Sequence, residues 1–369
     1  MGRTLNTVQN RGSYDIFLVA VILLLAGTGI SMLFSVSYLD AVSSGRAANS
    51  YLVTQLLGFG AGCICAVALA VIPVPIIRKM VPWFAFGCLL LNILPVFFPS
   101  INGARRWIFL PGFSLQPSEL LKFSTILYLA WDFVVKERKQ SCNYLHSLLI
   151  IFLGIIFVVF LQSDLSTSIF ISGLVLSMLF VSRLSFRIVI AAVLLIALIG
   201  GLAIFGSDYR RERMTGWGNQ EQNTMAENYQ ISSSKKAIGS GGLWGRGIGN
   251  GIYKNEGRLP EAKSDFIFAV TSEELGFIGV LLIISGFAFL AYRGYRGAVL
   301  AGDSFCFYVA FGITTCILYQ ALVNMAVISG LFPTTGIPLP FFSQGGTSIL
   351  VTMAMCGLLL NVTRTENGG

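Results

Sequence analysis

Long apolar runs alternate with short polar segments along almost the whole chain. Each run is close to the roughly 20 residues that an α-helix needs to cross the hydrocarbon core of a bilayer. A backbone in lipid must satisfy its own hydrogen bonds, so each run should be helical. The pattern predicts an all-α, polytopic integral membrane protein with about ten spans, at residues 15–37, 53–73, 80–98, 115–134, 144–161, 164–182, 187–206, 265–291, 305–328 and 345–363.

The composition supports one membrane domain over residues 1–369. Of these residues, 55% are hydrophobic and 11% are charged, whereas soluble domains carry about 25% charged residues. The net charge of +8 does not indicate nucleic-acid binding, because the basic residues lie in short loops between apolar runs. No removable signal peptide is expected, since the first apolar run is long enough to span the membrane and stay there.

The basic residues also predict the orientation. Those in short loops fall on one side, which should be the cytoplasm together with both termini; they are Arg3, Arg11, Arg78, Lys79, Lys136, Arg138, Lys139, Arg183, Arg187, Arg293, Arg296 and Arg364. The loops near 38–52, 99–114, 207–264 and 329–344 then lie on the outer face. The loop at 207–264 is also rich in cations, but long loops fall outside the orientation rule.

The last polar residue before one long apolar stretch is an acid, Asp265. An acid there loses hydration, so it needs a partner or a chemical role, although it could simply cap the following helix. Beside guanidinium and ammonium groups it could take a proton from a sugar hydroxyl while the cations hold a departing pyrophosphate. Glu273 and Glu274 lie about two turns further on, where a charge must face protein, water or the far interface.

Three further charged residues lie at the starts of predicted spans. Pro117 can open a helix in which Glu119 and Lys122 share one face and can pair. The pair could brace the bundle, or it could line a polar cavity and tune a neighbouring acid. Two ionisable groups one turn inside a span favour the second interpretation. Asp164 is best explained as the cap of the sixth span.

Two segments rich in glycine or proline stand out. Residues 239–251 offer close backbone approach and anion-binding N–H groups, but they follow no predicted strand and are not a dinucleotide fingerprint. Residues 336–348 predict either a rigid re-entrant turn that lines a cavity or a plain loop. The seven cysteines lie mostly in apolar runs and His146 is the single histidine, so a His/Cys metal site is not predicted.

Several motifs occur in order along nearly the whole chain: N-G-A-R-R-W-I, L-Q-P-S-E-L-L-K, Q-S-D-L-S-T, A-I-G-S-G-G-L-W-G-R-G-I-G-N-G, L-P-E-A-K-S-D-F-I-F-A-V, E-E-L-G and G-I-P-L-P-F-F-S-Q-G-G-T-S. Together they resemble the SEDS family (shape, elongation, division and sporulation) of bacterial peptidoglycan glycosyltransferases. The direct passage from G-I-G-N-G to R-L-P-E-A-K-S-D-F is more similar to the FtsW division branch than to the RodA elongation branch. Ser163 and Ser166 depart from the family's usual Pro and Gly, and Gln344 from its usual Tyr.

The resemblance implies an enzyme that polymerises lipid II into glycan strands at the outer face of the bacterial inner membrane. Asp265 would be the general base, and undecaprenyl pyrophosphate would leave. Glu119 and Lys122 would set the charge state around Asp265. The other residues implied at the substrate are Arg105, Arg106, Lys263 and Arg246 for pyrophosphate, Trp107 beside lipid or sugar, and Ser343 and Gln344 in the motif before the last span.

The resemblance also implies partners: a class B penicillin-binding protein transpeptidase and other division proteins. A divalent cation, Mg²⁺ or Mn²⁺, could help to neutralise pyrophosphate, but no ligand cluster in the sequence specifies one. The alternatives are a lipid II flippase or transporter, an elongation polymerase of the RodA type, and a structural scaffold. A flippase predicts a continuous polar path to the cytoplasmic face, and a scaffold does not explain the buried charges.

Overall fold

The structure, a computed structural model, describes residues 13–43, 50–100, 104–110, 113–139, 145–182, 184, 186–206, 225–259 and 262–364. Several features named above fall outside these residues: Arg3, Arg11, Cys142, Arg183, part of the loops at 38–52, 99–114 and 207–264, and the side chain of His146.

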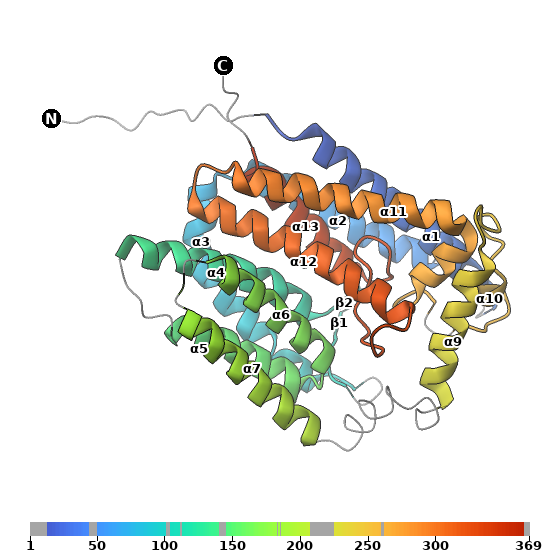
Figure 1. Ribbon diagram of the computed structural model, residues 1–369, viewed down its shortest axis with the longest axis horizontal. Coiled ribbons are helices and arrows are strands. Elements are labelled where there is room, and N and C mark those ends of the chain that lie inside the picture. The colour runs from blue at the N-terminus through green and yellow to red at the C-terminus, as the bar shows by residue number, and fades with distance from the viewer. Residues whose placement is uncertain are drawn as a thin grey trace.

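Each predicted span overlaps one long helix (Figure 1). The ten helices are α1 (Ile16–Ser43), α2 (Ser50–Val71), α3 (Val74–Leu91), α4 (Pro117–Lys139), α5 (Leu145–Ile156), α6 (Leu165–Val181), α7 (Phe186–Phe205), α11 (Ile267–Val299), α12 (Ser304–Ile328) and α13 (Gly346–Val362). The short elements are η1 (Leu94–Phe97), β1 (Ile108–Leu110), β2 (Phe113–Leu115), the π-helical turn η2 (Phe157–Leu161), α9 (Met225–Ser240) and α10 (Ile252–Asn255). Five helices are long and apolar enough to cross a membrane, and four more are apolar but shorter.

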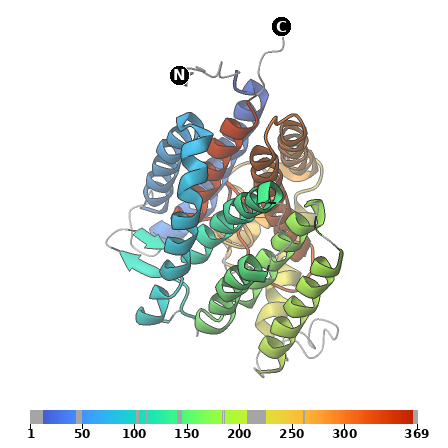
Figure 2. The same ribbon diagram turned by 90° about the vertical axis from the view of Figure 1, so that its left-hand side faces the viewer.

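The helices pack as a polytopic bundle. Helix α13 packs on α2, α11 packs on α12 and α1, and α12 packs on α4. Figure 2 shows α13 in red among the blue N-terminal helices, across the bundle from the green helices α5–α7. Helix α4 is the least apolar of the ten but is buried over most of its length. Its charged residues Glu119, Lys122 and Asp132 are among the buried ones, so they face protein rather than lipid.

One end of the bundle gathers the basic residues of the predicted cytoplasmic loops. Arg293 binds Asp15 at the start of α1, with Nε 2.7 Å from Oδ2. Arg78 lies 3.7 Å from Asp303, between the starts of α3 and α12. Arg364 stacks over Tyr14, with its guanidinium carbon 3.8 Å from the ring centroid. These contacts gather the starts of α1, α3 and α12 and the ends of α11 and α13 at one end of the bundle, as the charge pattern predicts for these segments.

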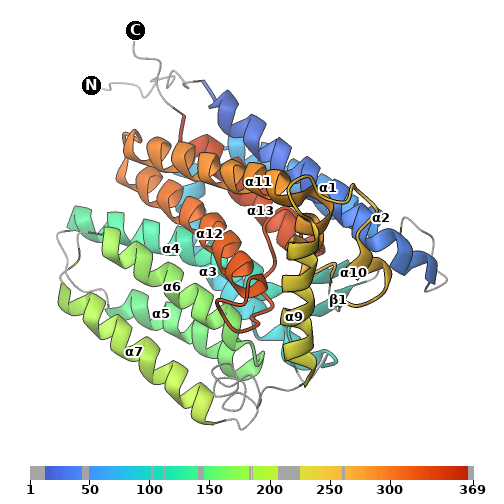
Figure 3. The same ribbon diagram turned by 45° about the vertical axis from the view of Figure 1, so that its right-hand side comes forward.

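The opposite end carries the predicted outer loops, and part of the long loop is helical. Helix α9 lies across the ends of α11 and α12 (Figure 3). Its 16 residues are mostly polar, so the apolar pattern along the chain did not reveal it. Helix α9 is held by small side chains: Ala237 is fully buried, and the Ser234 hydroxyl donates to the Ile328 carbonyl at 2.9 Å.

Helix α11 is broken at Gly276, where φ is +66°, and the glycine-rich segment fills the break. In a regular helix the N–H groups of residues 277 and 278 would bond to the carbonyls of 273 and 274. Here the N–H groups of Phe277 and Ile278 donate to the carbonyls of Gly242 and Leu243 at 2.9 and 3.2 Å. The orphaned carbonyls of residues 273 and 274 accept from the N–H groups of residues 246 and 247, both at 3.0 Å. We call residues 242–247 the wedge.

Glycine is required on both sides of this contact. A Cβ on Gly245 would lie 2.1 Å from the Glu274 carbonyl oxygen, and one on Gly276 would lie 2.2 Å from the Gly245 nitrogen. Both residues also have positive φ, which side chains disfavour. The predicted close backbone approach is therefore confirmed. It serves the helix break, and it fixes the first part of α11, which follows Asp265.

Candidate active site

Asp265 lies in the turn that leads into α11, one residue before the cap position, Phe266. It is therefore not itself the N-cap residue. Three successive carbonyls of this turn each accept a hydrogen bond from the surrounding protein. The Gln344 N–H donates to Lys263 at 2.8 Å. The Ser343 hydroxyl donates to Ser264 at 2.6 Å, and the Asn324 amide donates to Asp265 at 3.0 Å.

Residues 336–345 supply two of these donors and are folded into the protein. Leu339, Phe341 and Phe342 are buried, which favours the predicted re-entrant turn over a plain surface loop. The bend at Gly336, where φ is +69°, lies beside the catalytic candidate: a Cβ there would be 3.4 Å from Asp265 Oδ2. The Asp265 carboxylate thus faces backbone that carries no side chain.

The Ser343 hydroxyl has a structural task as well as its predicted substrate role. It accepts from the Leu339 N–H at 2.7 Å while it donates to Ser264. The adjoining Gln55 amide contacts both sides of residue 344, accepting from the Gly345 N–H at 3.3 Å and donating to the Ser343 carbonyl at 3.4 Å. The segment that holds the Asp265 turn is therefore itself anchored to α2.

Glu119 and Lys122 form the predicted pair, with Nζ 2.7 Å from Oε1 and both side chains buried. Helix α4 begins at Pro117 as expected. The Lys122 ammonium also lies 3.3 Å from Gln320 Oε1 and 5.1 Å from the centroid of the Phe170 ring. A buried ammonium thus has three kinds of partner, which is what a desolvated charge requires.

Gln320 and Asn324 on α12 connect this pair to the Asp265 turn. The Gln320 amide oxygen accepts a hydrogen bond from Lys122, and its nitrogen donates to the Pro338 carbonyl at 2.9 Å. One turn further along, the Asn324 amide donates to the carbonyls of Ile337 and Asp265 at 2.8 and 3.0 Å. Our sequence interpretation missed both residues. The signal was present, because two amides spaced i, i+4 inside an apolar span mark a polar face.

The arginines before β1 lie at the same end of the bundle, in a separate contact group. Arg105 is exposed and donates to the Val96 carbonyl at 2.8 Å. Arg106 lies 3.5 Å from the carboxylate of Asp164. Asp164 caps α6 as predicted, since it accepts from the Thr167 N–H at 3.1 Å. Trp107 is half-buried between these arginines and β1.

The two acids inside α11, Glu273 and Glu274, are fully buried and face the long loop. Glu273 accepts from the Ile252 N–H at 2.7 Å, with Arg246 at 3.7 Å. Glu274 accepts from the Gly249 N–H at 3.1 Å and from the ammonium of Lys254. One N–H group of the glycine-rich segment, that of Gly249, therefore binds a carboxylate of this chain, and the N–H group of Ile252, directly after the segment, binds a second.

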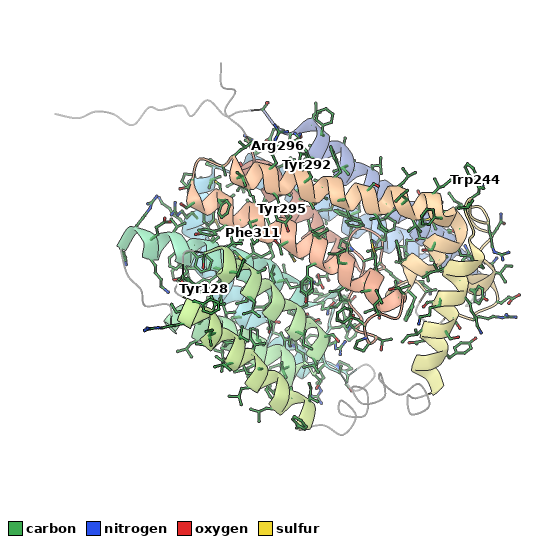
Figure 4. All side chains as sticks on the ribbon, viewed as in Figure 1. Tyr128, Trp244, Tyr292, Tyr295, Arg296 and Phe311 are labelled. Carbon is green, nitrogen blue, oxygen red and sulfur yellow. The ribbon has the colours of Figure 1, made fainter. Side chains whose placement is uncertain are left out.

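The structure thus brings together Asp265, Lys263, Ser343 and Gln344, and links them through α12 to Glu119 and Lys122. Arg106 lies with Asp164, and Arg246 lies with Glu273. Figure 4 shows Trp244, at the tip of the wedge, and Arg296 near opposite ends of α11. The wedge and the Asp265 turn therefore share the end of the bundle that is away from the basic loops.

The chain is similar to known proteins over nearly its whole length. The family model described as cell cycle protein, which covers FtsW, RodA and SpoVE, matches residues 15–368. A probable peptidoglycan glycosyltransferase FtsW from Geobacter metallireducens is 36% identical, over 96% of both chains. Stage V sporulation protein E of Bacillus subtilis is also 36% identical, over 95% of this chain and 97% of its own.

Solved structures share the fold. A chain from a peptidoglycan synthase complex superposes with a TM-score of 0.75 at 26% identity, covering 95% of this chain and 98% of its own. The rod shape determining protein RodA of Thermus thermophilus superposes with a TM-score of 0.70 at 24% identity, covering 96% of this chain and 99% of its own. The predicted all-α, polytopic membrane fold is therefore confirmed.

Proposed function

Because this chain belongs to the FtsW, RodA and SpoVE family of cell cycle proteins, we propose that it polymerises lipid II into glycan strands during cell division, with Asp265 as the general base. It is thus a peptidoglycan glycosyltransferase, as its relatives under the FtsW name are described. The observation that carries the role of Asp265 is the turn in which three successive carbonyls are hydrogen-bonded to the surrounding protein.

The reaction requires a fixed base beside an acceptor hydroxyl. Asp265 removes the proton of the 4-hydroxyl on the acceptor N-acetylglucosamine. That oxygen forms a bond to the anomeric carbon of the donor while the bond from this carbon to pyrophosphate breaks, with inversion. The proton stays on Asp265, and undecaprenyl pyrophosphate leaves with the electron pair. A positioned base of this kind contributes roughly 10²–10⁴-fold to a rate.

The departing pyrophosphate needs cations. We assign this role to Lys263, two residues before the base in the chain, and to Arg105, which is exposed. Arg106 and Arg246 are further candidates, although each lies beside a carboxylate, Asp164 and Glu273 respectively. Among the described residues, no three His, Cys, Asp or Glu side chains gather as metal ligands.

The site belongs at the outer face of the bacterial inner membrane, with both termini in the cytoplasm. The gathering of basic loop residues at the opposite end of the bundle supports this orientation. Trp107 sits beside lipid or sugar, and Gln344 contacts substrate from the turn that holds Lys263. The partner is a class B penicillin-binding protein, with other division proteins. The similarity to a chain of a peptidoglycan synthase complex supports the transpeptidase partner.

Packing in the middle of the bundle favours an enzyme over a lipid II transporter. Ile126, Leu174 and Ile313 are fully buried at the centres of α4, α6 and α12. Gly312 allows close contact there, since a Cβ would lie 2.5 Å from Ile126 and 3.1 Å from the Met178 sulfur. This closely packed contact lies between the polar end that carries Asp265 and the basic end of the bundle.

The test is polymerisation of lipid II by the purified protein together with its transpeptidase partner. Asp265→Asn keeps the shape of the side chain and removes the base, so glycan synthesis should fall by at least about 100-fold while the protein stays folded. Asp303→Asn is the matched control at the other end of the bundle, where Asp303 meets Arg78, and it should keep its rate. Near-normal synthesis by Asp265→Asn would refute the base assignment.

A further inference from the structure

Two buried amides on α12 link the Glu119–Lys122 pair to the Asp265 turn, and neither has an assigned role. Gln320 and Asn324 are each 2% exposed. They are spaced i, i+4, so both face the same side of α12. Each binds residues of the 336–345 segment, and each also binds a second partner, Lys122 for Gln320 and Asp265 for Asn324.

Asn324 holds two irregular backbone segments, at Asp265 and at Ile337, at a fixed distance from each other. Its Nδ2 donates to the Asp265 carbonyl at 3.0 Å and to the Ile337 carbonyl at 2.8 Å. Ile337 directly follows Gly336, where a Cβ would lie 3.4 Å from Asp265 Oδ2. One amide therefore sets the gap between the backbone of the base and the bend that its carboxylate faces.

The oxygen of the same side-chain amide contributes no hydrogen bond in the described part of the chain, although this atom, Asn324 Oδ1, is buried. Leaving a buried acceptor unsatisfied is unfavourable, so such groups are rare. The two donor bonds must outweigh that penalty. An apolar side chain could fill the space, but it could not hold both carbonyls.

Gln320 repeats this arrangement one turn away. Its Oε1 accepts from Lys122 at 3.3 Å, and its Nε2 donates to the Pro338 carbonyl at 2.9 Å. The carbonyls of residues 337 and 338 thus both accept hydrogen bonds from side chains of α12. The position of the base is thereby connected to the buried ion pair through residues 337 and 338 and α12.

We infer that Asn324, supported by Gln320, is a positioning residue that sets the place of the Asp265 carboxylate. This inference rests on the proposed role of Asp265 as the base. It predicts that loss of the two Asn324 donors lets the turn shift and moves the Asp265 carboxylate. Misplacement of a catalytic group by about 1 Å can lower a rate by roughly 100-fold.

The first variant is Asn324→Asp, which keeps the shape and removes both donors. Asn361→Asp is a matched control, because Asn361 Nδ2 also donates to two main-chain carbonyls, those of Leu69 and Ile72, at 2.6 and 2.7 Å. Asn361 lies near the C-terminal end of α13, away from Asp265. Asn324→Ser keeps one donor and serves as the second variant if Asn324→Asp does not fold.

Rates are measured per folded protein, from lipid II polymerisation with the transpeptidase partner, after size-exclusion chromatography and a thermal unfolding scan. Asn324→Asp should lower kcat by roughly 100-fold with a much smaller change in KM. The kcat of Asn324→Ser should lie between those of the wild-type protein and Asn324→Asp. Asn361→Asp should keep the wild-type kcat. Equal rates for the Asn324 and Asn361 variants would overturn the inference.

A second measurement separates positioning from a general loss of structure. Asp265→Glu keeps a carboxylate but displaces it by one methylene. If Asn324 acts through Asp265, Asn324→Asp should lower kcat by less than about 3-fold when it is added to Asp265→Glu, since the effects of mutations at residues that act together are not additive. If Asn324→Asp lowers kcat by the same factor in the wild-type protein and in Asp265→Glu, the inference is refuted while the base assignment stands. Activity in Asp265→Asn would instead refute the base and, with it, the positioning role.

Discussion

Replacing Lys122 with methionine tests the buried ion pair that is linked to the Asp265 turn. The ion pair with Glu119 is 2.7 Å long, and its side chains are 3% and 4% exposed. Removing the ammonium leaves a carboxylate inside the protein without a counter-charge, which costs about 3–5 kcal/mol. The loss of the bond to Gln320 at 3.3 Å adds about 1 kcal/mol. We expect Lys122→Met to destabilise the protein by about 4–6 kcal/mol.

The double variant Glu119→Gln/Lys122→Met separates two explanations of the pair. Replacing both charges removes the uncompensated carboxylate, so most of the lost stability should return. If the pair only braces the bundle, glycan synthesis should return with it. We expect the rate to stay low instead, on the proposal that Glu119 and Lys122 set the charge state around Asp265. The assays are equilibrium unfolding in detergent micelles and lipid II polymerisation by the same samples.

A second ion pair on the same helix provides the control. Lys136 and Asp132 lie 2.8 Å apart, spaced i, i+4, near the basic end of α4. Lys136→Met should lower stability by less, since Lys136 is 12% exposed, and should leave the rate per folded protein unchanged. A loss below about 1 kcal/mol for Lys122→Met would refute the reasoning from burial. Full synthesis by the double variant would refute the tuning role.

Two further predictions concern the supports of the site. Gly276→Ala places a Cβ 2.2 Å from the Gly245 nitrogen at a positive φ, so it should lower the yield of folded protein sharply in size-exclusion chromatography. Gly27→Ala, which meets nothing within 4 Å, should keep a normal yield, and equal yields would contradict the wedge. Thr347→Val removes a hydroxyl that accepts from the Gln116 N–H and donates to the Ser114 carbonyl. It should lower stability by about 1–3 kcal/mol in equilibrium unfolding, whereas an unchanged stability would show that water replaces the hydroxyl.

The sequence was sufficient for the helices because their length is set by the bilayer. Apolar runs located all ten, and Pro117 marked the start of α4. The ends were less certain where a helix continues into water. Helix α11 runs on to Val299, beyond the predicted end at residue 291, because its last turns are hydrogen-bonded like the rest although they are polar. Helix α9 was not predicted, because it packs on the bundle through small and polar side chains and so lacks an apolar run.

The contacts of the site were harder to predict because they join distant parts of the chain. The charges of Arg106 and Asp164 were visible, but their pairing depends on how the loop before β1 folds back onto α6. The glycine-rich segment showed that backbone approaches closely there, without showing what it approaches. The partner proved to be a broken helix, and a break at Gly276 is not visible in an apolar run. Local pattern thus identified the participants, and tertiary packing decided their partners.

The helix break and the amides on α12 act on the same short piece of backbone. Between Asp265 and Gly276 lies the first part of α11, little more than two turns long. The wedge binds its far end by four main-chain hydrogen bonds, and residues 324, 343 and 344 hold the turn at its near end. A base on a segment fixed at both ends loses little freedom when substrate binds, which is how preorganised sites lower a barrier. Loosening either end should therefore reduce the rate, and loosening both should cost little more than loosening one.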